Sequence, residues 1–459
     1  MYVRMYVCVY VCVYERMYVC IYVCCWKGTL RYSHLTQFAV DFGWQFQTTT
    51  LVAVLNSLHI RQFNKYYEEV RKIAAQTSGL ANRKASLLSA IRSKPRLLVC
   101  APSNAAVDNI ILKIMEDGFI DGNGNRYNPS IIRVGVGQSQ AVKDVALQAR
   151  VEGILADRLD MAKNDAAIAG YKAEQQRISA DIARLRLRIH AISKASQWPL
   201  SKNWEIRVDE SVFDTTPRVY FVNHKEKTTT FECPPPPEPD EKQYPATAMP
   251  EYRNFMAKVV KLVENYNSIS TKLEMCTIIQ SGMRGASGIT VQENLERHFL
   301  NTVHIVMTTL GTAGNRVLES ADRFEVVVVD EAAQSVEPAT LTALQKGSRH
   351  AILVGDPQQL PATIFNVSGR NSKYDRSLFQ RLEDAGHTVH MLNQQYRMHP
   401  EISRFPRKIF YGGNLKDGPN VERPDYGNPL RKILLTKVEA FHVSVTFNYV
   451  GACAVLSSI

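Results

Sequence analysis

Two acidic residues follow directly on an apolar run in the second half of the chain. The run Phe324–Val329 holds five apolar residues and one Glu, and Asp330 and Glu331 come next. Such a run is typical of a central parallel strand covered on both faces. At the end of that strand, one carboxylate could hold a magnesium ion and the other could activate a water for phosphate chemistry. Taken alone, the pair is equally compatible with a solvated strand end.

A second strand end follows in the sequence AILVGDPQQLPAT. The run His350–Val354 predicts a strand, and Gly355 predicts a turn that carries Asp356. Gln359 would then lie where it could contact the terminal phosphate of a nucleotide. Further along, LNQQYRMHPEIS contains Arg397, whose planar guanidinium suits phosphate binding. Together these segments favour phosphate chemistry over a solvated strand end.

Strands and helices alternate around these residues. Leu97–Ala101 predicts a buried strand, and a helix through Ala105–Met115 follows, with Asn104 as a plausible N-cap. Another strand begins within Thr302–Met307, and the segment 48–71 has a helical pattern of apolar residues. This alternation predicts an α/β fold with a parallel sheet.

Two apolar series with heptad spacing interrupt this pattern between about residues 139 and 300. They consist of Ile178, Ile182, Leu185, Ile189 and Ile192, and of Phe255, Val259, Leu262, Tyr266, Ile269 and Leu273. Two such helices separated by a compact insert predict an antiparallel coiled hairpin. Two ordinary amphipathic helices packed on the core are an equally compatible interpretation.

Five segments carry a resemblance to a known family. DEAAQ, GDPQQLP and QYRMHP match, in order and spacing, three motifs of the senataxin-like and nonsense-mediated-decay helicases of superfamily 1. APSNAAVDNI resembles that family's first nucleic-acid-contacting motif, and TTLGTAG at 308–314 resembles the next one. The resemblance covers about 48–137 and 300–425. It implies a RecA-like P-loop motor domain of the AAA type and an ATP-dependent RNA or DNA helicase, located in the nucleus.

The resemblance also implies a role for each motif residue. Asp330 would bind the magnesium that accompanies ATP, and Glu331 would activate water. Gln359 would couple nucleotide state to the grip on nucleic acid, and Arg397, from a second motor domain, would reach the γ-phosphate. The residues expected to contact the backbone of single-stranded RNA or DNA, without reading its sequence, are Ser103, Asn104, Thr308 and Thr309.

The chain departs from the family at the phosphate-binding loop. Such motors have a glycine-rich loop ending in Gly-Lys-Thr, whose amides and lysine hold the phosphates. Here DFGWQFQT puts Gln47 at the lysine position and Thr48 at the position of the hydroxyl that binds ATP and magnesium. The later motifs of the second motor domain are missing as well. An incomplete gene prediction is the expectation, and a truly degenerate motor is the alternative.

The insert between the two heptad helices has short β-forming stretches separated by polar turns. They predict a three-stranded sheet, with Trp204, Phe221 and Pro234 holding its ends together on one face. The segment resembles a WW domain, although Phe231 stands where that family has its second Trp. The predicted groove for a proline-rich peptide is lined by Tyr220, His224, Thr229 and Phe231. A stray β-hairpin followed by a proline-rich linker is the alternative.

The first 25 residues consist almost entirely of Met, Tyr, Val and Cys. A TGTA repeat in DNA encodes only these four residues, so we interpret 1–30 as a translated repeat or a gene-prediction error and exclude it from the fold. Charged residues at 4, 15 and 16 argue against a signal peptide or a membrane helix. The cysteines outside this tract lack metal-ligand spacing, which predicts a reduced compartment and no zinc site.

Length and charge complete the expected organisation. The 459 residues carry 55 Lys and Arg against 44 Asp and Glu, and the resulting charge of +11 favours a polyanionic partner. After the tract at 1–30, the expected divisions are motor domain 1 (40–137 and 300–385), two helical arms (138–196 and 250–299), the WW module (197–236), a truncated motor domain 2 (386–430) and an unassigned tail (431–459). The alternative function is a catalytically inactive adaptor that binds proline-rich proteins and nucleic acid. The loop before Thr48 discriminates between the two.

Overall fold

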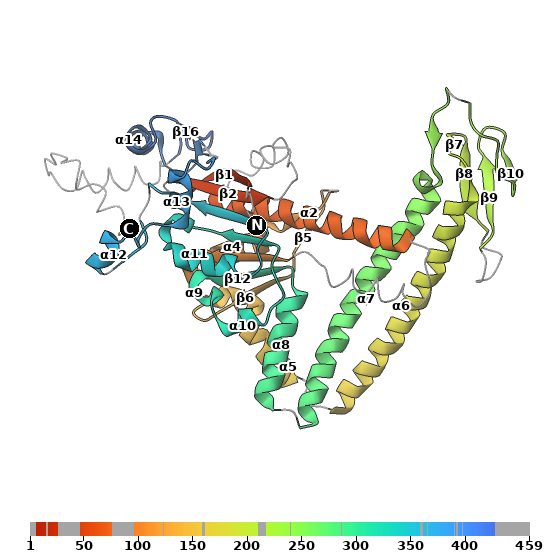
Figure 1. The fold of residues 1–459 in the computed structure, drawn as a ribbon, viewed down its shortest axis with the longest axis horizontal. Coiled ribbons are helices and arrows are strands. Elements are labelled where there is room, and N and C mark those ends of the chain that lie inside the picture. Colours follow the sequence, from red (N-terminus) through yellow and green to blue (C-terminus); the bar gives the residue numbers. More distant parts are fainter. Residues whose placement is uncertain are drawn as a thin grey trace.

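The fold is a central β-sheet with helices on both faces and a long helical hairpin that projects from it (Figure 1). The computed structural model describes residues 6–14, 17–25, 46–75, 96–122, 124–157, 161–209, 217–238, 240–285, 287–358, 361–364, 366–389, 391, 393–396 and 398–426.

Seven strands form the central sheet, in the order β1-β2-β14-β13-β3-β12-β6. Five of them run parallel: β3 (Leu97–Ala101), β6 (Ile131–Val134), β12 (Ile305–Thr309), β13 (Val326–Val329) and β14 (His350–Gly355). The predicted parallel α/β sheet is therefore confirmed, together with the strands expected at 97–101, 324–329 and 350–354. The strand expected to begin at 302 begins at Ile305 instead, because the preceding helix continues to Thr302.

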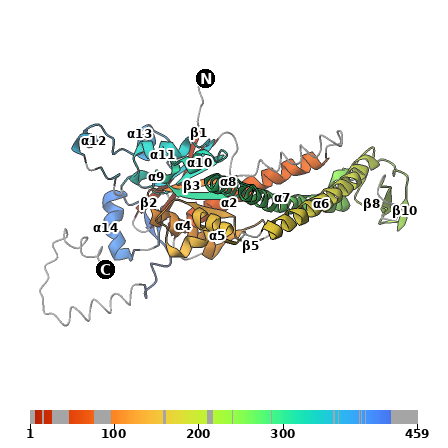
Figure 2. The ribbon, with the colours of Figure 1, turned by 90° about the horizontal axis from the view of Figure 1, so that it is seen from below.

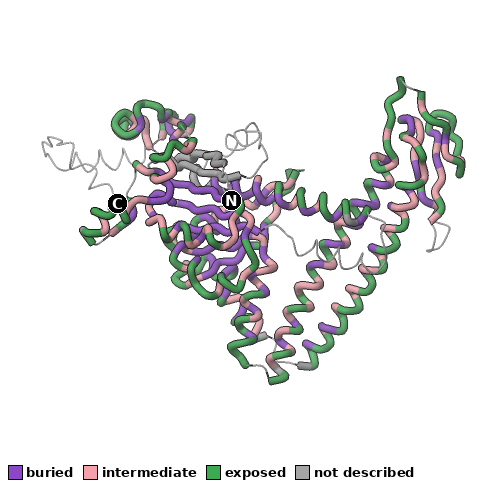
Figure 3. Tube along the Cα trace, viewed as in Figure 1, coloured by how far each residue is buried: buried purple, intermediate pink, exposed green. Residues whose placement is uncertain are grey.

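Helices cover both faces of this sheet (Figure 2). On one face, α2 (Phe46–Ala75) and α4 (Asn104–Asp117) pack over alternate strand residues such as Leu97 and Val99. The other face is covered by α5 (Leu147–Asp157), α8 (Gly288–Thr302), α9 (Leu310–Ala313), α10 (Arg316–Glu319), α11 (Glu337–Leu344) and α13 (Leu378–Asp384). Successive residues of a strand point to opposite faces, and the strands of the sheet are buried (Figure 3), so β13, which is buried on both sides, is apolar throughout.

The repeat-like tract at the start of the chain forms two strands of this sheet. β1 (Tyr6–Tyr14) and β2 (Met17–Cys25) pair as an antiparallel hairpin, and β2 pairs antiparallel with β14. The exclusion of 1–30 from the fold was therefore wrong for these residues. The reason is that Val and Tyr, which dominate this tract, favour strands, while β14 offers an otherwise open sheet edge.

The two heptad series form the predicted antiparallel hairpin. α6 (Met161–Ala195) and α7 (Pro250–Met283) lie side by side along their length (Figure 1). The second half of α2 joins them, and Tyr66 and Val70 are buried in the same apolar cluster as Ile182 and Val259. α2 thus runs from the face of the sheet to the hairpin. Within the described residues, no helix is both long and apolar enough to cross a membrane.

A small sheet lies at the far end of the hairpin. β8 (Trp204–Val208), β9 (Val219–Asn223) and β10 (Thr228–Thr230) form the predicted three-stranded antiparallel sheet, and β7 (Leu200–Ser201) pairs with β11 (Gln243–Tyr244) beside it. Ile206 and Phe221 are buried in the apolar cluster of α6 and α7. One face of this sheet is therefore continuous with the core of the hairpin.

The remaining elements are short. They are β4 (Phe119–Ile120), β5 (Arg126–Tyr127), η1 (Gln140–Val145), η2 (Ala246–Ala248), η3 (Ala332–Gln334), α12 (Val367–Asn371), β15 (Gln394–Gln395), α14 (Pro400–Phe410) and β16 (Lys416–Asp417).

Candidate nucleotide and nucleic-acid site

The acidic pair lies where β13 ends. The backbone N–H of Asp330 donates to the carbonyl of Cys100 on β3 at 2.8 Å, which fixes the backbone that carries the Asp330 side chain. Asp330 is 6% exposed. Glu331 adopts the left-handed conformation, with φ +50°. Non-glycine residues rarely do so, and those that do are frequent at functional sites. The side-chain amide of Gln334, which sequence reasoning missed, donates to the Glu331 carboxylate at 2.9 Å and orients it.

The end of β14 lies against the loop that carries this pair. A Cβ on Gly355 would lie 2.6 Å from the backbone nitrogen of Ala333, so only glycine permits the close approach. Asp356 is buried, and one of its carboxylate oxygens accepts from the backbone N–H of Gln358 at 2.9 Å. The other accepts from the hydroxyl of Tyr411 at 3.2 Å, a contact that the sequence did not predict.

Three predicted nucleotide contacts are not tested by the structure. Gln359 and Arg397 lie outside the described residues. Thr48 lies in the first turn of α2, but only its backbone is described. The roles of these three residues therefore stay predictions.

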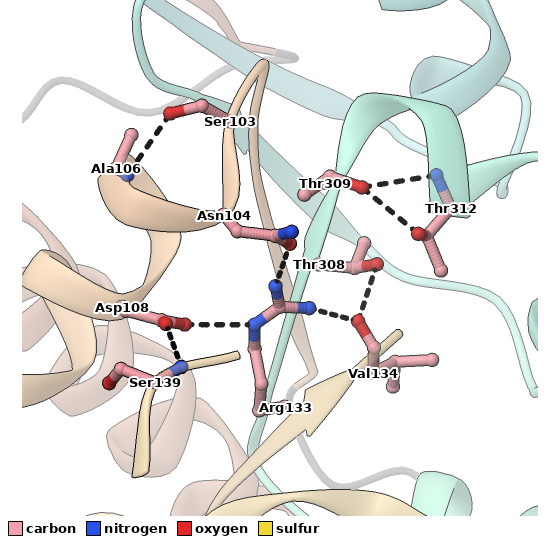
Figure 4. A network of polar contacts seen from close by, with 10 residues as sticks. All are labelled: Ser103, Asn104, Ala106, Asp108, Arg133, Val134, Ser139, Thr308, Thr309 and Thr312. Carbon is pink, nitrogen blue, oxygen red and sulfur yellow. Dashed lines mark hydrogen bonds and ion pairs between the residues drawn. The ribbon is translucent and has the colours of Figure 1, made fainter. Parts of the chain in front are cut away.

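A network of polar contacts joins the ends of β3, β6 and β12 (Figure 4). At its centre, Arg133 is fully buried and donates from Nε to the Asp108 carboxylate at 3.2 Å, and from Nη2 to Asn104 Oδ1 at 2.5 Å. It also donates to the carbonyl of Val134. The second oxygen of Asp108 accepts from the backbone N–H of Ser139 at 2.7 Å. The network ties α4 to the loop after β6, and neither member of its ion pair was singled out from the sequence.

The four residues predicted to contact the nucleic-acid backbone differ in how exposed they are. Ser103 is exposed, and its hydroxyl accepts from the N–H of Ala106 at 3.2 Å; it caps α4, the position predicted for Asn104. Asn104 is half-buried and uses its amide oxygen for Arg133. Thr309 is half-buried and caps α9 through the N–H of Thr312. Thr308 is fully buried and donates to the carbonyl of Val134 at 3.0 Å, so its predicted direct contact was wrong.

The four residues of the predicted peptide groove lie on or next to the small sheet at the tip of the hairpin. The rings of Tyr220 and Phe231 lie 6.1 Å apart at 61°, and the guanidinium of Arg218 lies 4.1 Å above the Phe231 ring. His224 and Thr229 are both exposed, and His224 contacts the Glu205 carboxylate at 2.8 Å. Two parallel aromatic faces, as a proline sandwich requires, are not present in this arrangement.

Comparisons with known proteins show which family and which relatives this chain is similar to. A family model described as AAA domain matches residues 44–367, and a second model described as AAA domain matches 374–449. "Probable helicase MAGATAMA 3" of Arabidopsis thaliana is 29% identical over 328 residues, which cover 71% of this chain and 25% of that protein. "Helicase SEN1" of Saccharomyces cerevisiae is 28% identical over 338 residues, covering 72% and 12%. "Probable helicase senataxin" of Homo sapiens is 40% identical over 136 residues, covering 26% and 5%.

The first family model alone covers more than half of the chain, which therefore belongs to the AAA-domain family. Within that family, its relatives identify it as a superfamily 1 helicase of the senataxin-like group, as the five motifs implied. The chain spans a quarter or less of the length of the three relatives named above.

Proposed function

We propose that this chain forms the motor core of an ATP-dependent helicase that acts on single-stranded RNA or DNA in the nucleus. The observation that carries the proposal is the common edge of the sheet. Asp330, Glu331 and Asp356 follow β13 and β14, Ser103 follows β3, and Thr309 is the last residue of β12. Ligands of open α/β sheets bind at this edge. A nucleotide and a nucleic acid would therefore bind side by side.

The acidic residues would divide the work of ATP hydrolysis. The Asp330 carboxylate offers the hard oxygen ligand that magnesium prefers, and magnesium would neutralise charge on the phosphates. Glu331, oriented by Gln334, would position and deprotonate the attacking water. Gln359 and Arg397 would sense and contact the terminal phosphate. The residues before Thr48 do not fit a phosphate cradle, because Phe46 and Gln47 supply neither a glycine nor a cation.

Binding to single strands tests the proposal directly. We expect sequence-independent binding whose affinity falls about tenfold or more between roughly 50 and 200 mM salt, because phosphate contacts release counterions. Ser103→Asp should keep the cap of α4 but put a negative charge at the expected phosphate contact, so it should weaken binding. Ser287→Asp, at the exposed N-cap position of α8, is the matched control and should bind normally. Fluorescence titrations with unrelated oligonucleotides measure both, and salt-independent binding would contradict the proposal.

The tip of the hairpin suggests a second function, as a WW-like module for proline-rich proteins. The three-stranded antiparallel sheet favours it, whereas the rings of Tyr220 and Phe231 lie at 61° to each other and would have to turn to hold a proline ring. Phe231→Trp should tighten peptide binding by enlarging the aromatic surface, and His224→Ala should weaken it. Phe405→Trp, at another half-exposed phenylalanine, is the control. Anisotropy titrations of labelled proline-rich peptides against the whole chain would reject this function if neither groove variant differed from wild type.

A further inference from the structure

α14 and β16 lie beside the central sheet (Figure 1), and a cavity of about 560 Å³ opens between them. Protein sites for small molecules typically measure about 300–1,000 Å³. The charged residues that line this cavity are Arg404, Arg407, Lys408, Lys416, Asp417 and Glu422. The cavity therefore combines the size of a small-molecule site with a mostly positive lining.

One of the two carboxylates, that of Asp417, is already satisfied within the fold. The Asp417 side chain is 5% exposed, and its Oδ1 accepts from Gln395 Nε2 at 2.5 Å and from Ser403 Oγ at 2.7 Å. Its Oδ2 accepts from the guanidinium of Arg407 at 2.5 Å, so these two charges neutralise each other. The same bonds hold α14 against β16, which fixes the two walls of the cavity.

The remaining charges of the lining are three cations and one carboxylate. Arg404 and Lys408 are exposed and lie one turn apart on the same face of α14, and Lys416 is exposed on β16. None of the three forms an ion pair with another described residue, and Glu422 is the one carboxylate left beside them. Cations that share a cavity without partners favour an anionic ligand, and Arg and Lys are the usual side chains for phosphate.

We propose that this cavity binds a small molecule that carries two or more phosphate groups. Several phosphates suit it better than one, because its cations come from two separate elements. The cavity is separate from the expected nucleic-acid contacts. The hydroxyl of Tyr411, which follows α14, donates to Asp356 at 3.2 Å and places α14 next to the end of β14, whereas Ser103 and Thr309 lie at the ends of β3 and β12. The inference does not rest on the proposed function.

The test is a calorimetric titration of the whole chain with inorganic triphosphate in the absence of magnesium. Arg404→Ala and Lys408→Ala should each weaken binding about tenfold, the loss expected for one hydrogen bond to a charged group. Lys172→Ala, at an exposed lysine of α6, is the matched control and should bind as wild type does. The proposal is wrong if the wild-type chain does not bind triphosphate, or if Lys408→Ala binds it as tightly as wild type.

A second variant should change the affinity in the opposite direction. Glu422→Gln removes the carboxylate that repels an anion in the cavity, so triphosphate should bind about threefold more tightly. Glu293→Gln, at an exposed glutamate of α8, removes the same charge elsewhere and should leave the affinity unchanged. If both variants gain equally, triphosphate responds to the net charge of the chain and the cavity is not its site.

A labelled single-stranded oligonucleotide distinguishes a small ligand from the phosphates of a nucleic acid. Lys408→Ala should bind the oligonucleotide as wild type does, because Lys408 lies away from the ends of β3 and β12. An equal loss of affinity for the oligonucleotide and for triphosphate would assign the cavity to the nucleic-acid surface and overturn the proposal.

Discussion

The edge of the sheet that carries the candidate site has a nucleic-acid half, after β3, β12 and β6, and a nucleotide half, after β13 and β14. The two halves are built in different ways. The loops after β3, β12 and β6 are fixed by the buried Arg133 and its partners, all within one contiguous network. After β14, the buried Asp356 instead accepts a hydrogen bond from Tyr411, which lies outside the sheet, and the sequence before Thr48 has Gln47 where the family has a lysine. We infer that the proposed nucleic-acid contact is preorganised, whereas the proposed nucleotide chemistry requires parts that the sheet does not supply.

The largest effect is expected at the nucleic-acid half. Asp108→Ala leaves Arg133 buried without its carboxylate, which typically costs ~3–5 kcal/mol. Asp181→Ala breaks an exposed pair with Arg184 and should cost at most ~1 kcal/mol. Chemical denaturation of both variants measures the difference. Similar losses of stability would mean that the network is not the rigid element of this edge.

A smaller effect is expected where β14 meets the acidic loop. Gly355→Ala forces a Cβ against the backbone of Ala333, and such overpacking typically costs ~1–3 kcal/mol. Gly153→Ala, within α5 and with no neighbour near its Cβ, should instead stabilise by ~0.5–1 kcal/mol. Thermal unfolding measures the melting temperature of both variants. If both melting temperatures shift in the same direction, the close approach at Gly355 does not require glycine.

The smallest effect is expected at the contact between the two matched AAA segments. Tyr411→Phe removes the hydroxyl that donates to Asp356 and should cost ~1 kcal/mol. Tyr374→Phe, at a side chain that is 51% exposed, should change nothing measurable. Denaturant midpoints compare the stability of the two variants. An unchanged midpoint for Tyr411→Phe would show that this hydrogen bond does not stabilise the nucleotide half.

Periodicity in the sequence predicted much of the fold. The apolar run before Asp330 and the heptad series in α6 and α7 are local patterns, and they correctly gave the buried strand and the hairpin. Pairing partners were harder to predict. β2 joins the sheet because β14 has an open edge, and an open edge is a property of the assembled sheet alone.

The roles that the motifs predict for the candidate site stay predictions, and the structure shows only how their side chains lie. Thr308 belongs to one of these motifs, but its place within β12 turns it into the core, toward the carbonyl of Val134. Arg133 was missed because a lone arginine inside an apolar run carries no signal until Asp108, 25 residues earlier, is brought next to it. Tyr411 was missed for the same reason.

ATP turnover tests the central claim most directly. The chain should hydrolyse ATP negligibly, with or without single-stranded RNA, because phosphoryl transfer depends on the missing cradle. Gln47→Lys alone should restore nothing, since the glycines are still absent. The combination Asp41→Gly, Phe46→Gly and Gln47→Lys recreates the glycines and lysine of the family's loop before Thr48. It should give slow magnesium-dependent turnover that Glu331→Gln abolishes, and turnover should stay slow because the later motifs of the second motor domain are still missing. Rapid turnover by the unaltered chain, lost on Glu331→Gln, would contradict the account.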